Sequence, residues 1–415
     1  MRKLFWVHPI IIGVLTYLLT FHVLYIFYDS TVKIPPVHHI AWILPFPYTL
    51  SCVIGLFFPY NDDYESRKKI RSFKNLYIVT VTKGSNREAV LRSWNTLKNL
   101  SDPERGIQMF VLTDEPHFFP DINCVTVPKS FQTKHAKYKA RALEYFRLLK
   151  KFTDEDWVLH LDEESTIDKE SLEQCVNFIE KTDYHFGQGI ILYNQHQYWQ
   201  RLLITVADAI RVGDDVGRFH FQYKIIHRPI FGAHGSFLLN NGAMENEITW
   251  EISGMTEDFE FALKSWLRGY RCGEILGLVR EQSPQSIIDF LKQRRRWFVG
   301  IRSIKHPIPR YLIFQWICGV VCFIVTIANF AIEHFRKMQS PYWVGLIGNF
   351  SFVVFGYLYL LGVVVQDYDY GYSFKKILFH VIIAIFLVPI ASFLECLSVL
   401  YGIFLVPKVF EVIKK

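Results

Sequence analysis

Long apolar runs near both ends of the chain enclose a more polar central stretch, which limits the folds open to it. Residues 5–28 form a run long enough to cross a bilayer, and the run lacks the small-residue cleavage site of a signal peptide. Residues 40–58 are a second candidate span, weakened by Pro45 and Pro47. The composition, with 51% hydrophobic and 16% aromatic residues, agrees with membrane segments that flank a polar centre.

Three more apolar runs follow Pro307. Residues 311–332 and 342–365 each predict one membrane span. Residues 378–406 form a run longer than one crossing requires, and because Pro389 interrupts it, we predict two short segments there. Basic residues flank the first two candidate spans and, by the positive-inside rule, place the N-terminus and the polar centre in the cytosol. These residues are Arg2, Lys3, Arg67, Lys68, Lys69, Arg71 and Lys74.

The polar centre, from about residue 75 to 302, has the pattern of an α/β domain. Strand-like runs at 75–82, 108–113 and 157–161 alternate with amphipathic helical patterns. Strands that alternate with helices indicate a largely parallel sheet whose ligands bind at the carboxyl ends of the strands. The seven cysteines are scattered without a CxxC pair, which argues against a disulfide scaffold and favours a reducing, cytosolic environment.

The strand-like run at 157–161 ends in three acids, Asp162-Glu163-Glu164. On an extended backbone Asp162 and Glu164 project to the same face, so we expect them to hold one cation together. Their hard oxygen ligands suit Mg²⁺ or Mn²⁺ better than zinc. A solvated acidic turn is the alternative. We expect His160, in the same run, to be packed and hydrogen-bonded rather than a metal ligand.

Two motifs further along the chain are ambiguous when each is taken alone. Thr256-Glu257-Asp258 begins an amphipathic helix, where a carboxylate is stabilised by the partial charge of the helix N-terminus, but a simple capping role explains it equally well. Gln293-Arg294-Arg295-Arg296-Trp297 ends a helix that begins near Gln285, with one apolar face and a basic end suited to a membrane surface. The alternative is a basic flank of the next span.

The order of these motifs is more specific than any one of them. An acid pair, then Thr-Glu-Asp, then Gln-x-x-Arg-Trp just before membrane spans resembles the inverting membrane glycosyltransferases of family 2, which include cellulose, chitin and hyaluronan synthases. Further segments resemble the egghead family of β-1,4-mannosyltransferases, which extend glucosylceramide using GDP-mannose. These segments are Val81-Thr82-Lys83-Gly84, Lys139-Ala140-Arg141-Ala142-Leu143, His160 to Glu164, Phe186-Gly187-Gln188-Gly189, Ala207-Asp208, Arg211-Val212-Gly213-Asp214-Asp215, Gln222, Lys224, His227, Gly235-Ser236 and Arg294 to Trp297.

The egghead resemblance covers about residues 75–300, whereas residues 238–252 and the terminal membrane segments depart from the family pattern. Because both departing regions would shape the acceptor site, the resemblance supports the donor chemistry better than the acceptor. It implies an α/β fold of the GT-A type, Rossmann-like with a mostly parallel sheet. We predict four consecutive regions: an N-terminal transmembrane hairpin at 1–60, a GT-A domain at 61–284, an interfacial helix with the QxxRW motif at 285–306, and a C-terminal transmembrane region at 307–415.

Inverting transfer requires a base, and the resemblance together with the helix position identifies Asp258 as the general base. Glu257 would orient the acceptor or the base. A metal ion on Asp162 and Glu164 would offset the charge that grows on the leaving diphosphate. Lys139 and Arg141, on the helix after a loop, would add cationic contacts to the diphosphate, with a solvated helix face as the alternative reading.

The remaining site residues follow from strand ends and from the family motifs. The predicted donor-binding residues are Thr82, Lys83, Asp114, Glu115, Lys139, Arg141, Asp162, Gln293, Arg296 and Trp297. The predicted acceptor-binding residues are Gly235, Ser236, Glu257 and Trp297. Arg211, Asp214 and Asp215 are either an acceptor contact or a structural ion-pair cluster, and we favour the structural role.

Two other functions stay open at this point. One is a processive polysaccharide synthase that uses a UDP-sugar, and the other is a transporter with a cytosolic regulatory domain, although the spans carry few ionisable residues. Nucleic-acid binding has little support, because the basic residues flank membrane segments. We expect the protein in ER or Golgi membranes with its catalytic domain in the cytosol, so that Asn99, in the sequon Asn99-Leu100-Ser101, is unmodified.

Overall fold

The computed structural model describes residues 7–20, 38–60, 64, 66–113, 122–332, 342–407 and 413–414. Its contacts divide the chain into two compact units. The helical unit comprises Met1–Tyr60, Arg201–Phe221 and Lys305–Val406, and the sheet unit comprises Asn61–Gln200, Gln222–Ile304 and Pro407–Lys415. Residues 201–221 therefore group with the apolar helices, although the sequence analysis placed them inside the central domain. The division of the chain into four consecutive regions otherwise stays a prediction.

The sheet unit is built on one mixed, mostly parallel sheet, which confirms the predicted α/β class. Its strands are β1 (Asn75–Thr82), β2 (Ile107–Thr113), β3 (Cys124–Thr126), β4 (Asp156–Asp162), β5 (Thr166–Ile167), β6 (Phe186–Leu192), β7 (Leu238–Asn241) and β8 (Cys272–Arg280). Their order across the sheet is β3-β2-β1-β4-β7-β6-β8-β5. β1 pairs in parallel with β2 and β4, while β7 runs antiparallel to both β4 and β6.

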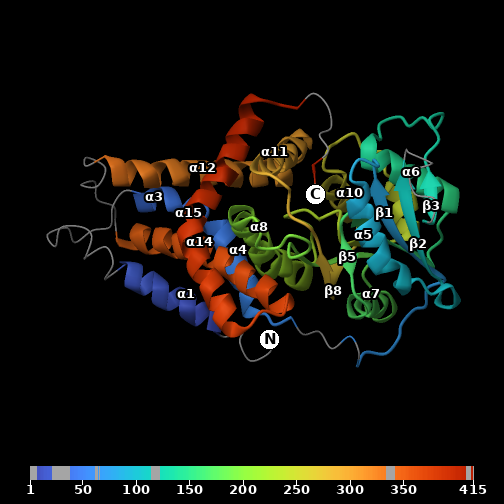
Figure 1. Cartoon of the computed structure of the whole chain (residues 1–415), viewed down its shortest axis with the longest axis horizontal. Helices are drawn as coiled ribbons and strands as arrows, with labels where there is room; N and C mark the ends of the chain where they lie inside the picture. The colour runs from blue at the N-terminus through green and yellow to red at the C-terminus, as the bar shows by residue number, and fades with distance from the viewer. Residues whose placement is uncertain are drawn as a thin grey trace. The chain divides into compact units, whose positions relative to one another are not determined.

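Helices cover the sheet because their apolar faces need a partner surface. Against its strands lie α5 (Arg87–Leu97), α6 (Tyr138–Lys150), α7 (Lys169–Lys181) and α9 (Gly242–Ile248), the first three labelled in Figure 1. The sheet unit also contains α10 (Glu257–Leu267), α11 (Ile287–Ser303) and 3₁₀ turns at Lys98–Leu100 and Pro103–Arg105. Local capping fixes where two of them begin. The Asp168 side chain accepts a hydrogen bond from the Ser171 amide at 2.8 Å before α7, and Ser286 accepts one from the Asp289 amide at 3.1 Å before α11.

His160 on β4 lies in a buried hydrogen-bond network, as the sequence analysis predicted. Its Nε2 contacts Oε1 of Glu245 on α9, and that oxygen also accepts a hydrogen bond from the Asn240 amide at 3.0 Å. The other Glu245 oxygen accepts from the Trp250 indole at 3.1 Å. Glu245 thus accepts hydrogen bonds from Asn240 and Trp250 and contacts the His160 ring inside the core, and His160 has a structural role there. The network includes residues of the 238–252 stretch, where the sequence departs from the family pattern.

Among the described residues of the helical unit, three helices are long and apolar enough to cross a membrane. They are α12 (Pro307–Ala331), α14 (Tyr342–Asp369) and α15 (Phe374–Phe404), joined by the shorter α1 (Val7–Leu18), α3 (His38–Trp42), α4 (Phe46–Phe57) and α8 (Leu202–Asp214). π-Helical turns at Asp215–Phe219 and Phe221–Ile226 continue the chain beyond α8. α4 starts directly after Pro45, in agreement with the predicted interruption. Of the first predicted span, residues 5–6 and 21–28 lie outside the described residues.

The prediction of two short segments at 378–406 is wrong, because α15 is one helix of 31 residues that contains Pro389. A proline removes one backbone hydrogen bond from a helix, but apolar helices tolerate it where neighbouring helices and side chains satisfy the freed groups. α15 packs against α14 and α12, so tertiary contacts outweigh the local break.

α8 packs very closely against α14 through two glycines (Figure 1). An ideal Cβ on Gly362 of α14 would lie 1.9 Å from the Ala209 carbonyl oxygen, and one on Gly213 of α8 would lie 2.3 Å from the Leu358 carbonyl oxygen. No side chain fits at either position without moving the helices apart. Small residues that permit such a close approach are typical of helix pairs in membranes.

We therefore expect Gly362→Ala to lower the melting temperature by several degrees, since forcing a methyl into a packed contact costs about 2 kcal/mol. Gly356→Ala on the same helix is the matched control, because a Cβ there meets no atom within 4 Å. The measurement is thermal unfolding of both variants in detergent. Equal melting temperatures for the two variants would contradict the close packing of α8 on α14.

Asp214 at the end of α8 has the structural role that the sequence analysis favoured. Its Oδ2 pairs with Arg218, one helical turn later, at 2.8 Å, and its Oδ1 accepts a hydrogen bond from the Tyr48 hydroxyl of α4. Both carboxylate oxygens are thus used within the helical unit. The Asp215 carbonyl oxygen accepts a further hydrogen bond from the Tyr60 hydroxyl at 2.9 Å.

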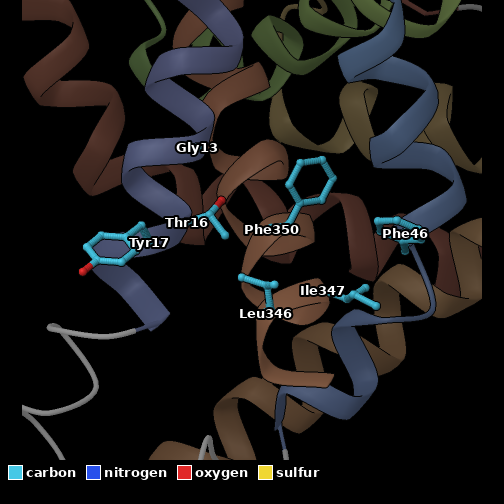
Figure 2. Close-up of a pocket in the computed structure, with 7 residues that line it drawn as sticks. All are labelled: Gly13, Thr16, Tyr17, Phe46, Leu346, Ile347 and Phe350. Carbon is cyan, nitrogen blue, oxygen red and sulfur yellow. The ribbon is translucent and has the colours of Figure 1, made fainter. Parts of the chain in front are cut away.

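An apolar cavity of about 360 Å³ lies among α1, α4 and α14 in the helical unit (Figure 2). Seven residues line it: Gly13, Thr16, Tyr17, Phe46, Leu346, Ile347 and Phe350. The Thr16 hydroxyl donates to the Ile12 carbonyl, so it offers no free donor to the cavity. With no titratable acid or base beyond a tyrosine in its lining, this cavity is not the place for acid–base chemistry.

Candidate active site

The candidate site lies at the carboxyl ends of neighbouring parallel strands in the sheet unit. β1 pairs Val81 with Asp162 of β4, and Thr82 with Thr113 of β2, so the ends of three strands meet at one edge. Thr82 therefore lies at the same sheet edge as Asp162, and its role in donor binding stays a prediction. Lys83 follows Thr82 as an exposed loop residue. The predicted donor residues Asp114 and Glu115 lie outside the described residues.

The acids after β4 lie in a turn, where the Ser165 amide donates to the Asp162 carbonyl at 3.0 Å. The extended-backbone argument that paired Asp162 with Glu164 is therefore wrong, because the strand ends at Asp162 and alternation does not continue past it. Glu163 points toward β1 and accepts hydrogen bonds from the Thr82 hydroxyl and the Asn86 amide. Burial, and then the Glu164 charge, raise the pKa of Glu163 to about 7.

The Lys139 side chain contacts residues from three motifs that are far apart in the sequence. Its Nζ forms an ion pair with Asp162, donates to the Gly235 carbonyl at 3.2 Å, and lies 3.9 Å from Oε1 of Glu257. The Lys139 side chain is 17% exposed, against 40% for Asp162. Burial alone would lower the pKa of Lys139, but Asp162 and Glu257 raise it well above its ordinary value, so the ammonium stays charged. The solvated-face alternative for Lys139 is therefore wrong.

The two acids of the Thr-Glu-Asp motif form the first turn of α10. Oδ2 of Asp258 accepts a hydrogen bond from the Gly235 amide at 2.7 Å, and Oδ1 accepts one from the Phe259 amide at 2.8 Å. A Cβ on Gly235 would lie 2.8 Å from the Lys139 Nζ and 3.1 Å from the Asp258 Oδ2, so this glycine lets both groups approach. Burial, and then the Asp258 charge, raise the pKa of Glu257 to about 7, whereas Lys139 opposes the rise. Ser236, the next residue, is buried.

α11 packs directly on the start of α10, because a Cβ on Gly300 would lie 2.7 Å from the Thr256 side chain. α11 carries the Gln-x-x-Arg-Trp motif. Gln293 is buried and its Oε1 accepts a hydrogen bond from Arg294 at 2.8 Å, while the Arg294 guanidinium lies 4.3 Å from the centre of the Trp297 ring. Arg296 and Trp297 are half-buried. The motif therefore sits on a helix that packs against Thr256, the residue before Glu257 and Asp258, and its role in binding stays a prediction.

Arg141, two residues after Lys139, binds backbone carbonyl groups of a loop. Its guanidinium donates to the Pro128 carbonyl at 2.6 Å and to the Phe131 carbonyl at 3.1 Å, so it holds the loop before α6. The structure thus brings together Thr82, Lys139, Asp162, Gly235, Glu257 and Asp258, but it does not bring Arg141 to the carboxylate cluster.

Sequence reasoning missed three contributors to this region. Glu163 was passed over because alternation pointed it away from the metal pair, and Asn86 because it precedes α5 without an obvious motif. The C-terminal residues Ile413 and Lys414 also reach the sheet unit: Asn86 donates to the Ile413 carbonyl at 2.9 Å, and the Gln285 amide donates to the Lys414 carbonyl at 3.0 Å. A segment so distant in sequence leaves no local pattern to find.

The side chains of Asp162 and Glu164 offer only oxygen ligands, which is compatible with a divalent cation. No group of three or more histidine, cysteine, aspartate or glutamate residues forms a complete metal cage among the residues that the structure describes. Mg²⁺ and Mn²⁺ need fewer protein ligands, because one or two carboxylates suffice when substrate phosphates and water complete the shell. Asp162 and Glu164 offer carboxylate oxygens of this kind, and their role as a metal pair stays a prediction.

Comparisons with known proteins agree with the motif order. Residues 157–405 match the family described as glycosyl transferase family group 2. The Drosophila melanogaster protein named beta-1,4-mannosyltransferase egh is 29% identical over 76% of this chain and 71% of its own length. Beta-1,4-mannosyltransferase bre-3 of Caenorhabditis briggsae is 29% identical over 72% of this chain and 70% of its own.

Among solved structures, the mannosyltransferase PcManGT from Pyrobaculum calidifontis, in complex with GDP-Man and Mn²⁺, superposes with a TM-score of 0.46. It is 12% identical and covers 88% of this chain and 99% of its own. The Staphylococcus aureus TarS fragment 1–349 in complex with UDP-GlcNAc superposes with a TM-score of 0.34 at 13% identity, over 77% of this chain and 90% of its own.

Proposed function

The chain belongs to glycosyl transferase family group 2, and from this premise we propose that it moves mannose from GDP-mannose to the membrane glycolipid glucosylceramide in β-1,4 linkage, with inversion. The chain is a glycosyltransferase with a GT-A-like sheet, so the transporter hypothesis is rejected. The choice of mannose is supported by the names of the curated relatives. GDP-mannose as donor and glucosylceramide as acceptor follow from the egghead resemblance.

One observation carries the proposed chemistry: Lys139 joins Asp162 at the strand edge to Glu257 beside Asp258. A displacement that inverts the sugar needs a base on one side of the anomeric carbon and a cationic surface for the leaving diphosphate on the other. We assign the base to Asp258, and the cationic surface to Lys139 together with the cation that Asp162 would hold.

In the proposed reaction the acceptor hydroxyl attacks the anomeric carbon as the bond from that carbon to the diphosphate oxygen breaks. Asp258 takes the proton of the attacking hydroxyl, and its orientation is fixed by the amides of Gly235 and Phe259. Glu257 orients the acceptor hydroxyl. Asp162 and Glu164 would hold a divalent cation, which would supply Lewis-acid stabilisation of the leaving diphosphate, while Gln293, Arg296 and Trp297 cover the diphosphate and the acceptor sugar.

The donor is tested with the purified full chain in detergent, offered GDP-mannose and UDP-sugars side by side with Mn²⁺ or Mg²⁺. We expect turnover of GDP-mannose and addition of a single sugar to the lipid. Turnover of a UDP-sugar into a long product would replace the proposal with a processive polysaccharide synthase, and absence of turnover with every donor would refute it.

The pH dependence follows from Glu257. An acceptor hydroxyl is oriented best by an ionised carboxylate, and because the pKa of Glu257 is raised to about 7, the rate rises as pH passes upward through about 7. Glu257→Gln has no proton to lose, so we expect this limb to disappear from the kcat/KM profile. Glu260→Gln is the control, since Glu260 pairs with Lys264 at 2.9 Å on the same helix. An unchanged limb in Glu257→Gln would refute the assignment.

We further propose that the protein resides in ER or Golgi membranes with the sheet unit facing the cytosol. Asn99, exposed on the 3₁₀ turn Lys98–Leu100, then stays without a glycan. The check is electrophoretic mobility before and after glycosidase treatment, with Asn99→Gln as the reference for the unmodified chain. A shift that Asn99→Gln abolishes would place the sheet unit in the lumen.

A further inference from the structure

The ammonium of Lys139 is surrounded by acceptors from three different elements. Asp162 comes from the end of β4, the Gly235 carbonyl from the loop before β7 at 3.2 Å, and Glu257 from α10 at 3.9 Å. A lysine ammonium has three donor hydrogens and no acceptor. Two hydrogen-bond acceptors, Asp162 and the Gly235 carbonyl, and the more distant Glu257 charge therefore surround the ammonium, which serves as the cation paired with Asp162.

The position of the ammonium is fixed by the fold rather than by a loose surface contact. The Lys139 side chain is 17% exposed, and Gly235 has no side chain where a Cβ would come within 2.8 Å of the Nζ. The Asp258 carboxylate also borders this glycine, with its Oδ2 3.1 Å from that Cβ position. The fold thus fixes the position of the ammonium between the proposed metal ligand, Asp162, and the proposed catalytic acids, Glu257 and Asp258.

On the basis of the proposed function, we propose that Lys139 and the divalent cation compete for Asp162, so that metal binding displaces the lysine. Two cations in contact with one carboxylate repel each other strongly at a partly buried site. Mn²⁺ and Mg²⁺ also need oxygen ligands in close contact, which the ammonium blocks at Asp162. The flexible four-carbon stem of lysine lets the ammonium move away without unfolding α6.

The exchange has a consequence for the order of binding. Without a diphosphate, the metal must break the ion pair between Lys139 and Asp162, and no phosphate oxygens are present to bind the metal or the displaced ammonium. With a diphosphate present, phosphate oxygens provide acceptors both for the metal and for the displaced ammonium. Metal and nucleotide therefore bind cooperatively, and each tightens the binding of the other by the same factor. Lys139 is a positioning residue in this scheme, because it restricts the metal to the nucleotide-bound enzyme.

The test is Mn²⁺ binding to the full chain in detergent, followed by the electron paramagnetic resonance signal of free Mn²⁺, with no sugar donor and with or without GDP. Without GDP, we expect Lys139→Met to bind Mn²⁺ about tenfold or more tightly than the wild type, the usual scale of coupling between two sites. Lys139→Arg keeps the charge and stays weak. Lys137→Met is the matched control, exposed before the same helix, and behaves as the wild type. Adding Asp162→Asn to Lys139→Met removes the gain.

Equal or weaker Mn²⁺ binding by Lys139→Met would overturn the exchange. So would a gain that persists in the double variant, or the absence of Mn²⁺ binding in every variant. If Lys139→Met does not fold, Lys139→Gln gives the same test, since its amide still donates to the Gly235 carbonyl. Because binding is measured without transfer, mannose transfer by the wild type would survive a failure of the exchange, and the two proposals are judged separately.

Discussion

Asp258→Asn abolishes sugar transfer in the proposed mechanism, with kcat reduced about 10³-fold, the usual scale for loss of a general base. Asparagine has nearly the shape of aspartate but cannot take the proton of the attacking hydroxyl. The donor KM should change little, because Asp258 contacts the Gly235 and Phe259 amides rather than the strand edge where the donor is expected to bind. The measurement is initial rates at saturating donor and acceptor.

Two controls separate loss of the base from loss of structure. Asparagine keeps one acceptor for two amide donors, so the melting temperature of Asp258→Asn must be compared with that of the wild type. Asp258→Glu keeps a carboxylate at a shifted position and should retain part of the activity. A rate for Asp258→Asn within tenfold of the wild type would remove Asp258 from the mechanism.

Asp162→Asn is expected to lower transfer on the order of a hundredfold, as loss of one electrostatic stabiliser of a developing charge typically does. The variant loses a metal ligand and leaves Lys139 without its ion-pair partner. Loss of the metal weakens the cationic surface that meets the leaving diphosphate. The rate should therefore also lose its dependence on Mn²⁺ concentration, which is measured by titrating the metal at fixed donor.

Asp154→Asn is the matched control for this variant, because Asp154 is exposed just before the amino end of the same strand. It should leave both the rate and the metal response unchanged. If Asp162→Asn kept the Mn²⁺ response of the wild type, the metal would have to bind elsewhere. If both variants lost activity equally, the effect would lie in the stability of β4 and not in the site.

Local sequence pattern was enough to predict the elements that carry the site. β1, β2 and β4 are continuous apolar runs, and α10 and α11 have clear amphipathic periods, so each was found close to its true bounds. Parallel pairing then brings Thr82 and Asp162 to one edge without further information. What local pattern does not contain is the antiparallel insertion of β7 between β4 and β6, which depends on contacts between distant segments.

The errors of the sequence analysis have the same origin. Glu163 turns toward β1 because the chain forms a turn after Asp162, and alternation holds only within a strand. α15 stays continuous through Pro389 because neighbouring helices support it. Residues 201–221 belong to the helical unit because α8 packs closely on α14, although they lie between segments of the sheet unit along the chain. In each case tertiary contacts outweighed the structure that the local sequence pattern predicts.

The most direct test of the account is incorporation of labelled mannose from GDP-mannose into lipid by the purified full chain, with and without glucosylceramide. The account predicts a product that requires glucosylceramide, carries one added β-1,4-linked mannose, and is absent with Asp258→Asn. Incorporation that is independent of glucosylceramide, or that persists in Asp258→Asn, would contradict it.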